Sequence, residues 1–109
     1  MLHLLNFQDE NGKSLLHFAV EQNNEEFVDL LLKRGVYVNL QNTEGRSPLM
    51  DAVRNDNIQI ILKLLKHGAD INLISKNNET AISEAWSNSN SKCANILWAI
   101  TSKRKNNKH

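Results

Sequence analysis

The feature that most constrains this chain is a repeat with a period of 33 residues. The segment NGKSLL at 11–16 returns as EGRSPL at 44–49 and, with more changes, as NNETAI at 77–82. The segment LLKRG at 31–35 returns as LLKHG at 64–68 with the same offset. Because separate landmarks share one period, we predict stacked units rather than a fold built around a single active-site pocket.

Each unit begins as a turn followed by a short helix. Ser14, Ser47 and Thr80 precede apolar-periodic runs, as N-cap hydroxyls do. Pro48 takes a first helical position, where a missing N–H costs nothing. The first helices are therefore expected at 14–22, 47–55 and 80–88.

A longer second helix is expected at 25–34 and again at 58–67, where apolar residues recur as one stripe. Gly35 and Gly68 follow at the position where glycine ends a helix. One unit cannot bury its stripe alone, so the stripes must stack against neighbouring units in a solenoid.

The unit resembles the ankyrin repeat, which reads G-x-T-P-L-H-x-A and, after a second helix, L-L-x-x-G-A-D-V-N. Residues 42–74 carry this pattern most fully, residues 9–41 match it well, and residues 75–102 form a degenerate C-terminal capping repeat. The resemblance implies an all-α, ankyrin-type helix-turn-helix solenoid with short β-hairpin-like turns between repeats. It also implies a non-catalytic interaction module without a cofactor.

The two ends leave alternatives open. Residues 1–8 resemble the closing turn of a unit whose helices are missing, so Leu2, Leu4 and Leu5 form either a minimal lid or the edge of a longer array. Because about three units are the minimum for independent stability, we expect a folded but marginal monomer. At the other end, residues 103–109 are polar and basic, and we expect a disordered stub.

Charge argues against nucleic-acid binding by the folded body. The chain carries 13 Lys and Arg against 12 Asp and Glu, and four of the basic residues lie in the last seven positions. The rest is therefore mildly acidic, which makes a poor counterion-releasing surface. The basic tail keeps nuclear targeting or nucleic-acid contact open as a second hypothesis. No apolar run approaches the roughly 18 residues of a membrane span.

Ser14 and His17, with Cys93, suggest a nucleophile and a base. The structural interpretation is stronger: Ser14 caps a helix, and His17 in the ankyrin pattern bonds backbone between units. Cys93 aligns with Phe27 and Ile60, which makes it a core residue, and a single cysteine fits a reducing compartment. The histidines share no ligand spacing, so we assign no catalytic, cofactor or metal residue.

Asn72 is a candidate for modification. Leu64, followed by Asp70-Ile71-Asn72, resembles the stretch of ankyrin proteins that asparaginyl hydroxylases modify. The alternative is that Asn72, like Asn39, satisfies backbone groups in the turn between units.

The ankyrin pattern places partner-binding side chains at the turn tips and along the exposed side of the first helices. Tyr37, in a closing turn, is the best candidate for an aromatic anchor, and its packing against the turn is the alternative. The polar candidates are Glu10, Asn11, Lys13, Glu21, Gln22, Thr43, Glu44, Arg46, Arg54, Asn55, Lys76, Asn77 and Glu79.

We therefore expect a cytoplasmic adaptor or scaffold that docks another protein or peptide in this concave groove. Two other interpretations stay open: a nuclear or nucleic-acid-associated protein that uses its tail, and an end fragment of a larger ankyrin protein. The 16 asparagines hint at an AT-rich genome, which leaves room for an effector delivered to a host cytosol.

Overall fold

The computed structural model describes residues 2–87 and 91–106, which form helices and no β-strand. The expectations for residues 88, 89 and 107–109 fall outside this part. The helices are α1 (Leu2–Leu5), α2 (Leu15–Glu21), α3 (Glu25–Lys33), α4 (Pro48–Arg54), α5 (Ile58–Lys66), α6 (Ala81–Ser87) and α7 (Ser91–Asn106).

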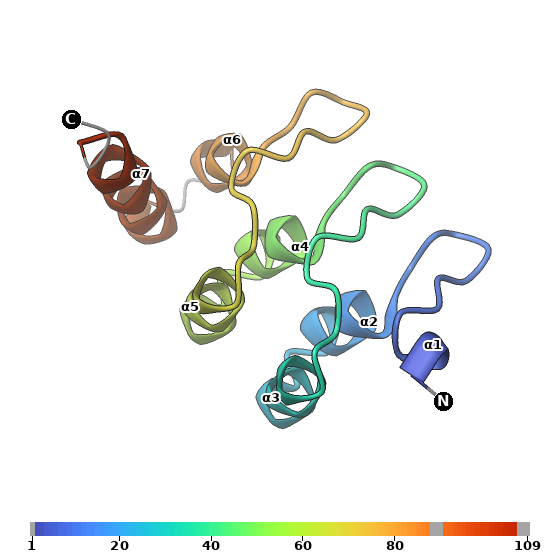
Figure 1. Ribbon diagram of the computed structural model, residues 1–109. Helices are drawn as coiled ribbons and strands as arrows, with labels where there is room; N and C mark the ends of the chain where they lie inside the picture. Colours follow the sequence, from blue (N-terminus) through green and yellow to red (C-terminus); the bar gives the residue numbers. More distant parts are fainter. Residues whose placement is uncertain (1, 88–90, 107–109) are drawn as a thin grey trace.

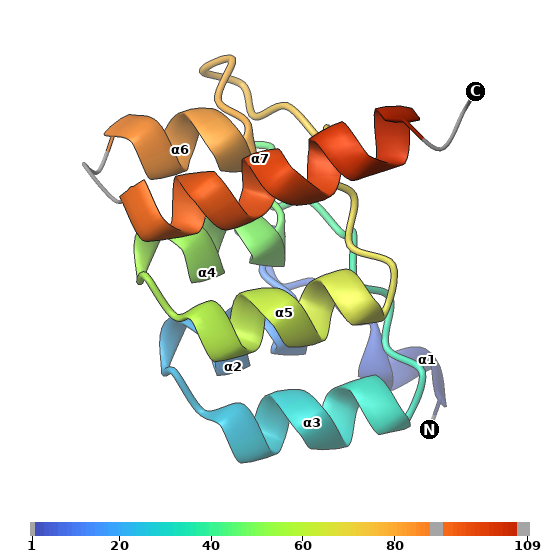
Figure 2. The same cartoon turned by 90° about the vertical axis from the view of Figure 1, so that its left-hand side faces the viewer.

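The helices form two layers (Figures 1 and 2). The first helices of the units, α2, α4 and α6, make one layer, and α3, α5 and α7 make the other. The long turns project from the side of the first layer, and the two termini lie at opposite ends of the stack. Within the layers α2 packs on α4, α4 on α6 and α3 on α5. This arrangement confirms the predicted all-α solenoid.

The helix starts follow the predicted caps. The Ser14 hydroxyl accepts the His17 N–H at 3.3 Å, and Ser47 accepts the N–H of Met50 at the same distance. Pro48 is the first residue of α4, as expected. The starts of the three first helices and the ends of α2 and α4 lie within one residue of the predicted bounds, because these signals are local in sequence.

The apolar stripes of the second helices are buried in one continuous core. Val28 on α3, Ile60 on α5 and Leu97 on α7 are all fully buried, and Cys93 joins them at 1% exposed. The predicted core position of Cys93 is therefore confirmed. The stripes meet across unit boundaries, so each unit depends on its neighbour for burial.

Adjacent turns approach so closely that glycine is required at their tips. Gly45 has φ +78°, and a Cβ there would lie 2.9 Å from the backbone nitrogen of Lys76. Gly12 makes the same approach to the turn of the second unit. Asn78 stands at this position in the third unit, with φ 63°.

The C-terminal helix corrects one expectation. Residues 103–106, predicted as part of a disordered stub, belong to α7. Thr101 stands where Gly35 and Gly68 follow α3 and α5, and its hydroxyl donates to the Leu97 carbonyl at 2.9 Å. Without a glycine to reverse the chain, the helix continues.

The lead-in, residues 1–8, ends in an isolated antiparallel bridge between Gln8 and Ser14. Its Leu5 is half-buried against the core, whereas Leu4 is 53% exposed. Leu5 therefore packs against the core, whereas Leu4 does not. Among the described residues, the hairpin-like turns contain this bridge and no strand.

Candidate protein-binding surface

The turn tips are shaped by one acceptor side chain in each unit. Asp9 Oδ1 accepts the N–H groups of Asn11 and Lys13, each at 2.9 Å. The equivalent acceptors are Asn42 Oδ1 in the second unit and Ser75 Oγ in the third. These three residues were not predicted from the sequence. Two signals could have identified them: they are 33 residues apart, and each lies three residues before a tip position, Gly12, Gly45 or Asn78.

Neighbouring tips are joined through their backbones. The N–H of Thr43 donates to the Asn11 carbonyl at 2.9 Å, and the N–H of Lys76 donates to the Glu44 carbonyl at 2.9 Å. The side-chain amide of Gln8 crosses the same boundary to the Gln41 carbonyl at 3.1 Å. These bonds hold successive tips in a fixed stagger, so side chains on them keep defined separations.

Between the first two tips lies a polar hollow of about 410 Å³, here called the tip hollow. It brings together five of the predicted candidates and one residue that the sequence analysis missed. The lining residues are Asn11, Lys13, Glu21, Asn42, Thr43 and Glu44. Asn42 is half-buried, and its amide oxygen is committed to shaping the second tip.

One wall of the tip hollow is an ion pair. Lys13 Nζ lies 2.9 Å from Glu21 Oε1, and each side chain is about one-third exposed. The hydrogen bond to Glu21, with the charge of its carboxylate, raises the pKa of Lys13 above its ordinary value. Lys13 therefore stays charged, and its charge is largely matched within the wall.

Arg46 does not lie on the surface, which corrects its assignment as a binding residue. Its side chain is 4% exposed, with Nε 3.1 Å from Asp51 Oδ1 and Nη1 3.3 Å from Glu79 Oε1. Its Nη2 lies 2.6 Å from Glu84 Oε1. Acids on its own first helix and on that of the next unit draw the side chain inward, because a buried guanidinium needs several acceptors.

Two buried ionisable groups in this cluster have shifted pKa values. Burial raises the pKa of the Asp51 carboxyl, although the hydrogen bond from Arg46 and its positive charge oppose the shift. Burial lowers the pKa of Arg46, but hydrogen bonds to Glu84 and Asp51 outweigh this and raise it overall. The cluster joins the second unit to the third and is not available to a partner.

The candidates outside the tip hollow are exposed apart from Arg46 and Glu79, and they are not all close together. Arg54 is 55% exposed and 3.8 Å from Glu84, and Tyr37 is 63% exposed. The N–H of Tyr37 is held by the Asn6 side chain at 2.8 Å, and Tyr37 does not line the tip hollow. Glu79 is half-buried beside Arg46. The remaining candidates are exposed: Glu10, Gln22, Asn55, Lys76 and Asn77.

Ser14 and His17 have the predicted structural roles. His17 is fully buried, with Nδ1 accepting the Ser14 N–H at 3.1 Å and Nε2 2.9 Å from the Arg46 carbonyl of the next unit. Both ring nitrogens are therefore occupied by structural contacts. Within the described part of the chain, no group of three or more His, Cys, Asp or Glu could hold a metal ion.

Asn72 and Asn39 occupy the same place in successive closing turns. Asn39 bridges units, accepting the Asp70 N–H at 2.8 Å and donating to the Gly68 carbonyl at 3.2 Å. Asn72 is exposed, and its own N–H donates to Asp70 Oδ1 at 2.8 Å. Hydroxylation of Asn72 stays a prediction.

A family model described as ankyrin repeats (3 copies) matches residues 2–75. No curated protein matches the chain significantly. No helix among the described residues has both the length and the apolar character to cross a membrane.

Proposed function

The chain belongs to the ankyrin repeat family, whose members are protein-interaction domains and are generally not catalysts, and we propose that it acts as an adaptor that binds a peptide segment of another protein in the tip hollow. No chemical step is assigned to the chain. The binding is expected to use polar and charged contacts along the first two turn tips.

The tip hollow is the observation that supports this proposal. Asn11, Thr43 and Glu44 come from two different turns, yet the bond between the Thr43 N–H and the Asn11 carbonyl fixes their spacing. A site held by backbone bonds loses little conformational entropy when a partner docks. Affinity then depends on how well the partner matches the fixed donors and acceptors.

The charge around the tip hollow indicates what the partner offers. Glu21 and Glu44 line the hollow, and Glu10 is exposed on the first tip. Lys13, the cation in the lining, is paired with Glu21, so these two charges offset each other and Glu44 and Glu10 supply the net negative charge. An acidic rim without a free cation favours a segment with Lys or Arg side chains, steered by complementary charge. We therefore propose a basic peptide segment as the ligand.

A selection of random peptides displayed on phage tests this proposal. Binders enriched on the intact chain are expected to be basic, and the variant Glu44→Lys should weaken them by at least tenfold. The matched control is Glu26→Lys, which makes the same charge change on α3, away from the tips. Binders that lose equal affinity in both variants, or that ignore Glu44→Lys, would contradict the proposal.

A further inference from the structure

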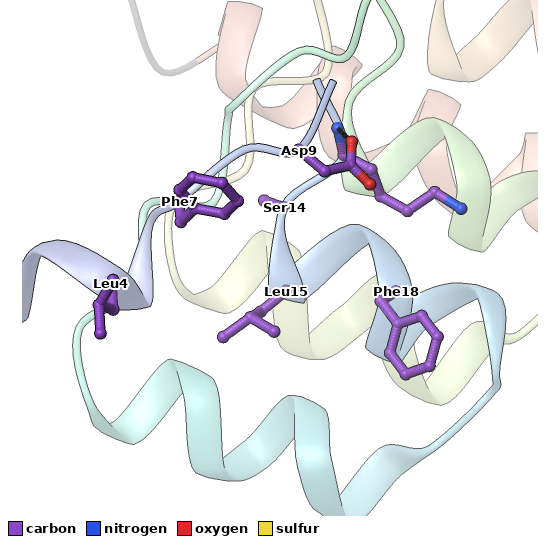
Figure 3. Close-up of a pocket in the computed structure, with 7 residues that line it drawn as sticks. Leu4, Phe7, Asp9, Ser14, Leu15 and Phe18 are labelled. Atoms are coloured by element: carbon purple, nitrogen blue, oxygen red, sulfur yellow. Dashed lines mark hydrogen bonds between the residues drawn. The ribbon is translucent and has the colours of Figure 1, made fainter. Parts of the chain in front are cut away.

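The first unit carries an apolar hollow of about 320 Å³ on its outward side (Figure 3). Its apolar lining consists of Leu4 from α1, Phe7 from the lead-in, and Leu15 and Phe18 from α2. The rest of the lining is polar or charged and consists of Asp9, Lys13 and Ser14. The four apolar side chains, here called the N-terminal end face, are 40–61% exposed. Four large apolar residues on one exposed face mark an interaction surface and not scattered surface residues.

The repeat register shows what this face normally contacts. Leu15 corresponds to Pro48 and Ala81, and both of those residues are almost completely buried. Phe18, 48% exposed, corresponds to Asp51 and Glu84, which are 7% and 5% exposed. In the second and third units the preceding unit covers these positions, since α2 packs on α4 and α4 packs on α6. The N-terminal end face is therefore one half of a repeat-to-repeat interface.

The third unit exposes the other half. Trp86 is 56% exposed, whereas Val20 and Val53, at the same place in the first two units, are fully buried. Trp98 is 59% exposed, whereas its counterparts Leu32 and Leu65 are 6% and 8% exposed. Trp86 and Trp98 are here called the C-terminal end face.

Contacts inside the molecule confirm that this side of a unit meets its successor. The amide of Asn55, at the end of α4, donates to the Val20 carbonyl at the end of α2. Lys63 on α5 reaches back to Asp29 on α3 at 3.0 Å. The Val20 carbonyl, at the position equivalent to Trp86, is thus a point at which the first unit contacts the second.

We propose that copies of this chain stack end to end, with the C-terminal end face of one copy against the N-terminal end face of the next. The contact continues the interface already present between units within the chain. It differs in chemistry, because Phe18 replaces the buried acid and Trp86 replaces valine. Aromatic packing then takes the place of the ionic cluster around Arg46.

Pairing of unlike faces has a defined consequence for assembly. A heterologous contact leaves a free face at each end of the dimer, so further copies add in the same way. The average mass should therefore grow with concentration and should not stop at a dimer. This outcome differs from the monomer expected from sequence, in which the lead-in is a lid or the edge of a longer array and the third unit is a cap.

Sedimentation velocity of the intact chain over a wide concentration range tests the proposal. Phe18→Asp places on the N-terminal end face the acid that Asp51 supplies in the next unit, and Trp98→Lys alters the C-terminal end face. Each variant alone should have a smaller average mass than the parent at the same concentration, because its self-association is weakened at least tenfold. A mixture of the two should form a heterodimer, because one intact face of each kind remains. Leu62→Lys, at a 43% exposed position on α5, is the control and should associate like the parent.

Three results would overturn end-to-end stacking. The first is a monomeric parent at every concentration reached. The second is a dimer lost in Phe18→Asp but unchanged in Trp98→Lys, which would indicate pairing of two N-terminal end faces. The third is a mixture that stays monomeric although circular dichroism shows both variants folded. If Phe18→Asp does not fold, Phe7→Ser, at a 61% exposed position, replaces it.

Discussion

The guanidinium of Arg46 and the carboxylate of Glu84 meet inside the boundary between the second and third units, with Nη2 2.6 Å from Oε1. Arg46 follows the tip glycine of its turn, and Glu84 lies on α6. The same guanidinium also binds Asp51 on α4. One cation therefore compensates two buried acids on successive first helices.

Replacing Arg46 with methionine should strongly destabilise the fold. Asp51 and Glu84 would be left buried without their cation, and breaking a buried ion pair from one side costs about 3–5 kcal/mol. Urea unfolding measures the loss. Arg54→Met is the control, because Arg54 is 55% exposed and 3.8 Å from Glu84, and a surface change of this kind costs about 0.5 kcal/mol or less. Equal losses in the two variants would show that the cluster contributes no special stability.

The pKa of Asp51 predicts a pH dependence of stability. Burial raises this pKa above the ordinary value of 3.8. An acid with a higher pKa in the folded state binds its proton more tightly there, so its contribution to stability grows as the pH falls toward 3.8. That contribution is lost as the pH rises through the raised pKa. The free energy of unfolding of the parent, relative to that of Asp51→Asn, should therefore increase as the pH is lowered from 7 to 4.

Urea titrations of the parent and of Asp51→Asn at several pH values measure this difference. Subtracting the two curves removes the titration of groups that both proteins share. A difference that stays constant, or that shrinks as the pH falls, would mean that Asp51 has no raised pKa in the folded protein.

The tip glycines should differ from the helix-ending glycines in their tolerance of alanine. Gly45 and Gly68 both have positive φ, so alanine costs each about 1 kcal/mol. At Gly45 the new Cβ would also lie 2.9 Å from the Lys76 nitrogen, and such overpacking adds about 1–3 kcal/mol. At Gly68 nothing lies within 4 Å of that Cβ. Thermal unfolding should thus show a clearly larger loss for Gly45→Ala, and similar losses would argue against a rigid contact between the tips.

The sequence predicts the helices well because their signals are local. Ser47 caps α4 and Pro48 opens it, and the stripes follow the period of a helix, so the bounds agree within one residue. Arg46 was assigned wrongly because its direction depends on Glu84, which is 38 residues away in sequence. A repeat pattern says which position a residue occupies, but not which side chain of the next unit it will meet.

The exposure of Leu15 and Phe18 on the N-terminal end face was not predicted, for a related reason. Leu15 and Phe18 fit the apolar pattern of a first helix, and that pattern does not distinguish residues facing the core from residues facing a neighbouring unit. Their exposure appears only when the equivalent positions, Pro48 and Asp51, are compared in three dimensions. The tip hollow was easier to anticipate, because the tips follow from the repeat register alone.

Replacing His17 tests how much the contact between the first unit and the turn of the second contributes to stability. The second unit has Met50 at the same position, 1% exposed, so methionine fits this place in a first helix. In His17→Met the buried Ser14 N–H loses the Nδ1 acceptor, and the Arg46 carbonyl loses its contact with Nε2. Leaving a buried donor unsatisfied costs about 1–3 kcal/mol, and urea unfolding should show a loss in this range. Met50→Leu is the control, since a volume-conserving swap costs less than about 1.5 kcal/mol. If His17→Met proves no less stable than Met50→Leu, the bonds between His17 and the two turns contribute no net stability.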